Sequence, residues 1–189
     1  MSRSENLRPG SVIEWAMSTS ELCSPQSASA PSFRRAMSAL AGGVTIVTTR
    51  DRAAAPCGLT ATATCLVSHE PPLLLVCVAR DADCHAAFLE ADAFALHLLR
   101  AGQEPLARRF AARDPRKFDG LSTEVGRLGP PLLPGGLGVV ECRVVERHGA
   151  GDHTIVIGRA EAWRIAAEEG DGPLLYYRRA YGRLAAPDG

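Results

Sequence analysis

The sequence predicts a mainly β protein of the α+β class, built as a small antiparallel barrel with short flanking helices. Three observations carry this prediction. Six or seven segments have the composition and patterning of strands. Most of them follow one another through short turns rich in glycine and proline, as strands in hairpins do. The two or three helical segments do not alternate with strands as they would in a parallel α/β sheet.

With 189 residues, the chain is long enough for one domain with a sizeable core. We expect residues 1–31 to form a flexible tail, because they are rich in serine and carry proline and glycine with little periodicity. Met17, within this tail, is an alternative start of the natural chain. Residues 32–186 form the predicted domain.

The first predicted elements are a short helix and a strand. Ser32 is the expected N-cap of a helix with apolar residues at three- and four-residue spacing, and Gly42 and Gly43 end it. Residues 44–49, VTIVTT, have a strong strand pattern. A phosphate loop follows a strand and opens a helix, whereas these glycines follow a helix and open a strand. No G-x-G-x-x-G or Walker pattern occurs elsewhere, which excludes a Rossmann fingerprint.

The run 58–78, GLTATATCLVSHEPPLLLVCV, is the centre of the predicted barrel. Its first half alternates threonines with small apolar residues at the period of a strand. Pro71 and Pro72 mark a turn, and residues 73–78 are apolar throughout, as in a strand buried on both faces. The row of small residues and hydroxyls leaves room for a flat ligand. The alternative is a strand whose threonines face water.

The remaining segments complete the barrel pattern. From residue 100 to 117 there are six basic residues against two acidic ones, which indicates either a solvated helix face or an anion site. The expected elements, in order, are a polar loop (80–85), a short helix (86–91), a strand (94–99), a helix (102–112), strands at 137–145 and 154–164, and a C-terminal segment with tyrosines (174–181).

Charge and cysteine content narrow the partners and the compartment. Lys and Arg number 21 against 21 Asp and Glu, and this balance argues against nucleic acid or an anionic membrane surface as the main partner. The six cysteines form no C-x-x-C pair and no zinc-like spacing, so we expect no metal site and a reducing cytoplasm. Neither a signal-peptide pattern nor a window of 18 apolar residues occurs, so we expect no membrane span.

Several motifs taken together identify a family. They are FRRAMSALAGGVTIVTT, GLTATATCLVS followed by PPLLLVCV, FALHLL, Lys117-Phe118 with Gly120, GDHTIVIG, and LLYYRRAYGRL. In this order, from residue 33 to 184, they resemble the flavin reductases of the flavin-reductase-like split-barrel family, the NAD(P)H-dependent components of two-component flavin monooxygenases. The resemblance implies a flavin-binding split barrel, and a homodimer with flavin near its interface.

The resemblance also implies an activity. It is the NADH-dependent reduction of free flavin, with FAD preferred over FMN and NADPH as the alternative to NADH. The reduced flavin would supply a partner monooxygenase in aromatic or secondary-metabolite metabolism. Hydride passes between the two cofactors, so no side chain is expected to act as a catalytic acid or base.

By position, the resemblance places the flavin along the threonine strand, with its ribityl chain and phosphate at the polar loop. Arg80 suits a phosphate because guanidinium binds it bidentately, and the alternative is a surface arginine. Lys117 and Phe118 are implied at the far phosphate or adenine. The residues implied to bind flavin are Thr60, Ala61, Thr62, Ser68, Arg80, Asp83, Cys84, His85, Lys117 and Phe118.

Two histidines and two tyrosines carry further expectations. His97 stands where the family strand usually has asparagine, so it either hydrogen-bonds the flavin or packs between strand and helix. His153 is implied to meet the nicotinamide nucleotide, or is a turn histidine paired with Asp152. Tyr176 and Tyr181 resemble aromatics that close over the dinucleotide, or are core residues.

Two other functions fit the same barrel. A non-catalytic flavin-binding or flavin-storing protein would keep the threonine strand and have no use for His153. A pyridoxine-phosphate-oxidase-like enzyme would need a larger basic cluster around its phosphate.

Overall fold

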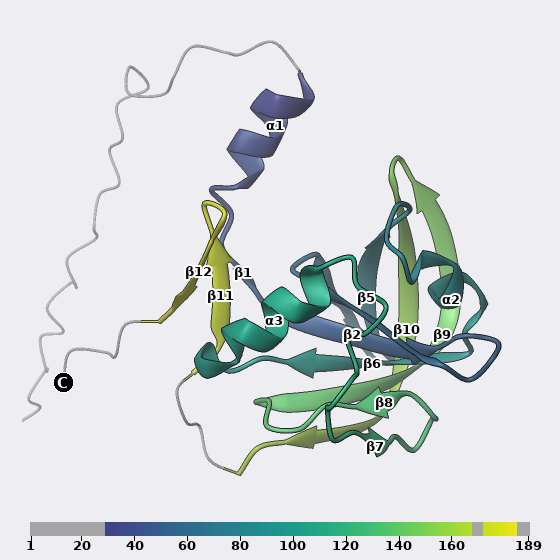
Figure 1. Ribbon diagram of the computed structural model, residues 1–189. Helices are drawn as coiled ribbons and strands as arrows, with labels where there is room; N and C mark the ends of the chain where they lie inside the picture. Colours follow the sequence, from purple (N-terminus) through teal and green to yellow (C-terminus); the bar gives the residue numbers. More distant parts are fainter. Residues whose placement is uncertain (1–28, 168–171, 185–189) are drawn as a thin grey trace, which may run out of the picture.

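The computed structural model describes residues 29–167 and 172–184, so most of the predicted tail, including Met17, lies outside the described residues. Its centre is a seven-stranded antiparallel sheet in the order β3-β2-β6-β9-β10-β5-β4 (Figure 1). The strands are β2 (Thr45–Arg50), β3 (Pro56–Ala61), β4 (Thr64–His69), β5 (Pro72–Ala79), β6 (Ala93–Leu98), β9 (Gly138–Ala150) and β10 (His153–Ile165). The prediction of a mainly β, antiparallel barrel is confirmed.

Shorter elements surround the barrel. A second sheet has the order β1-β11-β12, and a hairpin pairs β7 with β8. None of the described helices is long and apolar enough to cross a membrane. These elements are α1 (Ala30–Met37), β1 (Gly42–Gly43), α2 (His85–Glu90), a 3₁₀ turn (Ala101–Gln103), α3 (Glu104–Ala111), β7 (Glu124–Val125), β8 (Pro131–Leu132), β11 (Leu174–Tyr177) and β12 (Ala180–Arg183).

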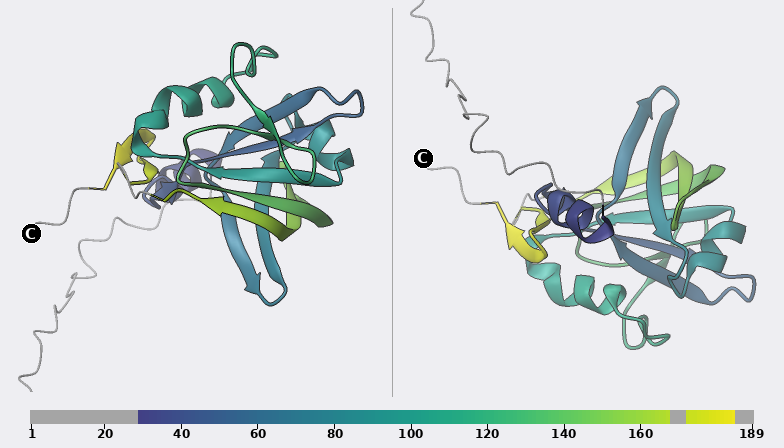
Figure 2. Two further views of the ribbon diagram at one scale, coloured as in Figure 1. Left: turned by 90° about the horizontal axis from the view of Figure 1, so that it is seen from below. Right: turned by 90° about the horizontal axis from the view of Figure 1, so that it is seen from above.

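The run predicted as one strand before the proline turn is two strands that meet at a corner. β3 ends at Ala61 and pairs with β2, whereas β4 begins at Thr64 and pairs with β5. Only Thr62 and Ala63 join these strands, which stand at opposite ends of the sheet order, so the sheet curls and brings its two edge strands together at this corner. Figure 2 shows the β4–β5 hairpin projecting from the barrel. The alternation of small and hydroxyl residues continues through the corner, so the pattern does not reveal the break.

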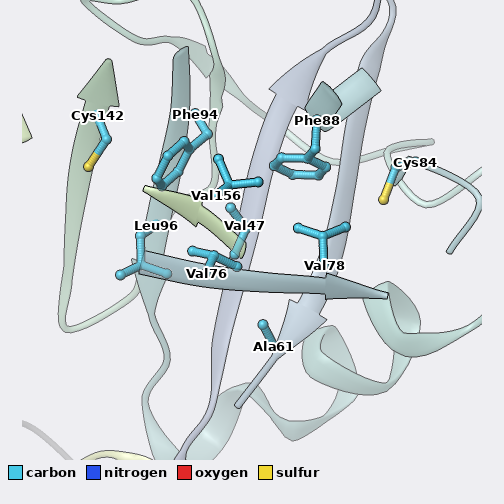
Figure 3. Packing of buried hydrophobic residues seen from close by; sticks show 10 residues of the cluster. All are labelled: Val47, Ala61, Val76, Val78, Cys84, Phe88, Phe94, Leu96, Cys142 and Val156. Atoms are coloured by element: carbon cyan, nitrogen blue, oxygen red, sulfur yellow. The ribbon is translucent and has the colours of Figure 1, made fainter. Parts of the chain in front are cut away.

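The barrel interior is filled by apolar side chains from six strands, from α2 and from the residue before α2. Phe94 of β6 is fully buried, and its ring lies over Gly158 of β10. Figure 3 shows the buried side chains of this core: Val47, Ala61, Val76, Val78, Cys84, Phe88, Phe94, Leu96, Cys142 and Val156. This core fixes β3, β5 and β10, the strands that carry the site described below.

Helix α3 packs closely on β3. Gly58 lies against the ring of Phe110, and a methyl group on this glycine would stand 2.9 Å from a ring carbon. The hydroxyl of Thr60 donates to the carbonyl of Ala107 at 2.7 Å. The small residue and this hydrogen bond therefore fix the helix along the free edge of the barrel.

The N-cap of helix α1 lies three residues before the predicted one. Ser29 is the N-cap, and Ser32 is the reciprocal partner in a capping box, since Ser29 Oγ accepts from the Ser32 N–H and Ser32 Oγ accepts from the Ser29 N–H. No residue of α1 is buried, and Phe33 is 68% exposed. Figure 1 shows this helix standing clear of the barrel.

Candidate functional site

A cavity of about 350 Å³ lies at the corner where β3 meets β5. Its floor comes from β3 and the corner, and its walls come from β5, the loop after β5, the end of α3, and the first residue of β10. The lining residues are Leu59, Thr60, Ala61, Thr62, Ala63, Cys77, Ala79, Asp81, Ala82, Asp83, Phe110, Ala111, Ala112, Arg113, Lys117 and His153. The pocket therefore sits at the edge of the barrel, where β3 lacks a strand partner on one side.

Small side chains dominate the surface of this pocket. Six of its lining residues are alanines, whose small side chains leave space between the polar groups of the pocket: Ala61, Ala63, Ala79, Ala82, Ala111 and Ala112. Ala61 is buried between the pocket floor and the barrel core. Small side chains leave room for a flat ring in this pocket, whereas larger side chains at the same positions would fill that space.

Lys117 places a cation in the pocket wall. Its side chain is buried, with 9% exposure, and its Nζ donates to the Gly58 carbonyl at 3.4 Å. Within the described residues it forms no ion pair with a carboxylate. Burial without a paired carboxylate is costly for an ammonium group, so this position favours an anionic ligand. Phe118 lies behind the wall, edge-on to Phe110 at 5.0 Å between ring centroids.

His153 faces the pocket and is also paired locally. Its Nδ1 lies 2.7 Å from Asp152 Oδ1, and this hydrogen bond lowers the pKa of the Asp152 carboxyl. An ionised carboxylate can only accept, so Nδ1 donates its proton to Asp152 and Nε2 is left for a ligand. The two alternatives drawn from the sequence are thus compatible, because the local pair orients a ring that lines the pocket.

The structure brings together six of the predicted site residues and leaves eight outside the pocket lining. The six are Thr60, Ala61, Thr62, Asp83, Lys117 and His153. The eight are Ser68, Arg80, Cys84, His85, His97, Phe118, Tyr176 and Tyr181. The predicted residues on β3, its corner and β10 converge, whereas most of those assigned to the polar loop and the C-terminal segment do not.

The polar loop contributes acidic residues to the pocket in place of Arg80. Arg80 is exposed, its N–H donates to the Asp152 carbonyl at 2.9 Å, and its guanidinium lies beside Gly149. Cys84 packs in the barrel core, and burial raises the pKa of its thiol to about 11. His85 Nε2 lies 2.9 Å from Thr154 Oγ1. The surface-arginine alternative therefore describes Arg80 better.

Ser68 and the two tyrosines also lie in other surroundings. Ser68 is on β4, opposite Leu73, near the turn of the projecting hairpin. Tyr176 and Tyr181 pack edge to face at 5.1 Å between centroids and belong to the cluster beneath α3. The guanidinium of Arg108 lies 4.8 Å from the Tyr181 ring centroid. The core alternative fits both tyrosines.

His97 is a buried packing residue. Its Nδ1 donates to the Ile46 carbonyl at 3.1 Å, and its Nε2 accepts from the Leu133 N–H at 3.0 Å. Both ring nitrogens are thus used within the protein, which leaves neither for a flavin. Burial lowers the pKa of His97 to about 4, with a smaller contribution from the charge of Arg164. Of the two predicted roles of His97, the structure therefore agrees with packing and not with binding of a cofactor.

We expect His97 to make the fold less stable as the pH falls from about 6.5 to about 4. An unfolded histidine takes up a proton near pH 6.5, whereas the buried ring does so only near pH 4, so acid favours the unfolded chain throughout this window. The loss is roughly 3 kcal/mol, at about 1.4 kcal/mol per unit of pKa shift. Urea unfolding at a series of pH values measures it. His97→Gln keeps a donor and an acceptor and should lose this slope; an unchanged slope would contradict the assignment.

Sequence reasoning missed several lining residues. Cys77 and Ala79 share one face of β5, and their alternation was hidden because the whole strand is apolar. Asp81 and Arg113 are charged residues in loops, where no periodicity exists. The basic run from 100 to 117 was the available signal for Arg113, since an anion site was one of its two interpretations.

A pocket that combines several alanines, a buried cation and an oriented histidine is suited to a flat, anionic ligand, such as a nucleotide cofactor. The flavin reductase like domain matches residues 37–185 of the chain. The FMN reductase (NADH) SmoA of Agrobacterium fabrum is 43% identical over 154 residues, which cover 82% of this chain and 86% of that protein.

Two further relatives support the same grouping. The reductase subunit HsaB of a flavin-dependent monooxygenase from Rhodococcus jostii is 35% identical over 149 residues, 79% of this chain and 75% of that protein. The NADH:FAD oxidoreductase SgcE6 of Streptomyces globisporus, solved with NAD and FAD fragments, has a TM-score of 0.75 and 34% identity, covering 82% of this chain and 92% of that one. The chain belongs to the flavin reductase like family, so the predicted family, split-barrel fold and oxidoreductase class are confirmed.

Proposed function

We propose that this protein transfers hydride from NADH to a flavin nucleotide, with FAD preferred over FMN, and supplies the reduced flavin to a separate monooxygenase. The pocket at the β3–β5 corner is the observation that carries the proposal, because it joins six alanines to a buried cation and a histidine. The names of the relatives support NADH as donor and flavin as acceptor. The relative named as a monooxygenase reductase subunit supports the partner. We further propose that this partner monooxygenase acts in aromatic or secondary-metabolite metabolism.

The side chains bind and orient, while the two nucleotides supply the redox chemistry, a hydride transfer from nicotinamide to flavin. Ala61 and Ala63 admit a ring to the pocket floor, and Lys117 attracts its anionic end. His153, held by Asp152, offers Nε2 to the second nucleotide. The protein thus contributes by holding two flat rings in contact, which avoids the entropic cost of a collision in water.

A steady-state assay tests the proposal. The purified protein is mixed with NADH or NADPH and with FAD or FMN in all four combinations, and the loss of absorbance at 340 nm is followed. We expect the highest kcat/KM for NADH with FAD. Absence of NADH oxidation with either flavin would refute the reductase function, and a higher kcat/KM with FMN would refute the flavin preference alone.

Replacing His153 with alanine should weaken the use of NADH and spare flavin. Loss of one oriented hydrogen bond should raise the apparent KM for NADH, or lower kcat, by about tenfold. The Kd for flavin, measured by fluorescence titration, should stay within about twofold of the original. His148→Ala is the matched control, since His148 pairs with Glu146 at 2.6 Å on β9 and lies outside the pocket. An equal loss of flavin affinity in His153→Ala would make this histidine structural.

We also propose that the protein is a homodimer. Helix α1 presents Phe33 and Met37 to solvent, the turn after it presents Leu40, and β4 presents Leu66 and Val67. Apolar side chains gathered on two projecting elements are suited to a second copy of the same surface. Light scattering coupled to gel filtration measures the mass directly, and a monomer at micromolar concentration would contradict the proposal.

A further inference from the structure

The pocket carries its charges on two different walls. Asp81 and Asp83 come from the loop after β5, whereas Arg113 and Lys117 come from the segment after α3. The floor between these walls, from Leu59 to Ala63, is uncharged. A flavin nucleotide is divided in the same way, into an uncharged ring and an anionic phosphate. Its phosphate end is therefore suited to the wall formed by Arg113 and Lys117, which we call the cationic wall.

The two cations of this wall are held differently. Lys117 is buried and without a carboxylate partner in the described part of the chain. Arg113 is 69% exposed, and its Nη2 donates to Oδ2 of Asp81, which is 76% exposed. This ion pair joins the cationic wall to the acidic loop across the pocket. So exposed a pair contributes little to folding, and its members can exchange partners at small cost.

We propose that Asp81 competes with the phosphate of the flavin nucleotide for Arg113. Asp81 holds Arg113 until a nucleotide enters, and Arg113 then leaves the carboxylate to bind the phosphate, where guanidinium forms bidentate hydrogen bonds. This inference rests on the proposed function, since it needs a flavin in the pocket. The nucleotide gains Arg113 only by displacing Asp81, so it binds more weakly and leaves faster than it would from an unpaired arginine. Riboflavin, which lacks a phosphate, has no part in this competition.

The Kd values of FMN and riboflavin measured by fluorescence titration test the proposal in four proteins. Asp81→Asn frees Arg113 and should tighten FMN by about threefold, in line with an exposed ion pair. Arg113→Gln removes the charge-assisted hydrogen bonds and should weaken FMN by about tenfold. The double variant should match Arg113→Gln alone, because Asp81 acts through Arg113. Riboflavin should bind all four proteins equally.

Asp83→Asn is the matched control. Asp83 lines the same rim and forms no ion pair with Arg113 in the described residues, so its loss changes the local charge without freeing the guanidinium. It should tighten FMN less than Asp81→Asn does. The proposal would be overturned if Asp81→Asn and Asp83→Asn raised the affinity for FMN equally. It would also be overturned if Asp81→Asn raised this affinity as much in the Arg113→Gln background, because the effect would then come from net charge alone.

The outcome also separates this inference from the proposed function. Oxidation of NADH by the unchanged protein with FMN, together with variants that fail to distinguish FMN from riboflavin, would overturn the role of Asp81 and Arg113 alone. Failure of the unchanged protein to bind or reduce any flavin would overturn both.

Discussion

Replacing Gly158 with alanine should lower the free energy of unfolding by roughly 3 kcal/mol, the upper part of the range for an overpacked core. The added methyl group would stand 2.5 Å from a ring carbon of Phe94 and 2.7 Å from the β-carbon of Cys142. Neither neighbour has space to move, because Phe94 and Cys142 are both fully buried. The clash therefore has to be relieved by separating β10 from β6 and β9 in the centre of the barrel.

Urea unfolding measures the effect, and Gly182→Ala provides the control. Gly182 is also a strand residue, but a methyl group there would meet nothing within 4 Å. We expect that variant to change the free energy of unfolding by less than about 0.5 kcal/mol, as surface substitutions usually do. Comparable losses in the two variants would mean that the cost comes from the strand conformation of alanine rather than from the Phe94 contact.

Replacing Ala61 with leucine should weaken flavin binding by roughly 10- to 100-fold, because extra methylenes in a packed site cost roughly 1 to 3 kcal/mol. Ala61 lies between the pocket floor and the barrel core, so a larger side chain would displace the floor against which a flat ring would lie. Flavin titration measures the loss, and circular dichroism reports whether the fold is retained.

A second variant distinguishes a loss of flavin affinity caused by the pocket from one caused by a destabilised fold. Ala61 also touches the barrel core, whereas Ala63 lines the same pocket from an exposed position. Ala63→Leu should therefore weaken flavin while leaving the stability nearly unchanged. Ala180→Leu, on an exposed position of β12, adds the same atoms far from the pocket lining and should leave flavin affinity as it was. Normal flavin affinity in both pocket variants would place the ring elsewhere.

The strands were predictable because their patterns are local. Residues 44–49 and 94–99 agree with β2 and β6 within one residue, and the proline pair does mark the turn between β4 and β5. The corner at Thr62 and Ala63 was not predictable, since it is defined by which strands pair across the sheet and not by the residues at the corner. The same limit applies to the cap of α1. The sequence predicted Ser32 as the N-cap, whereas Ser29 is the N-cap and Ser32 is its hydrogen-bonding partner.

The site divides in a similar way. The threonine–alanine run and His153 were found because short motifs mark them, and the structure brings them to one pocket. Arg80 and His97 illustrate the opposite case, since a guanidinium or an imidazole has many ways of satisfying its hydrogen bonds. Arg80 is directed toward Gly149, and His97 joins Ile46 to Leu133. Only the three-dimensional arrangement decides between such partners.

The two-residue corner between β3 and β4 sets a limit on insertions and deletions. A turn at the tip of a projecting hairpin can lengthen without disturbing the strands, but this corner carries the chain from one edge of the sheet to the other. One added residue would shift β4 by one position against β5 and turn Thr64 and Leu66 to the opposite face, since side chains alternate along a strand. The number of residues between Ala61 and Thr64 therefore helps to determine the shape of the pocket, together with the side chains that line it.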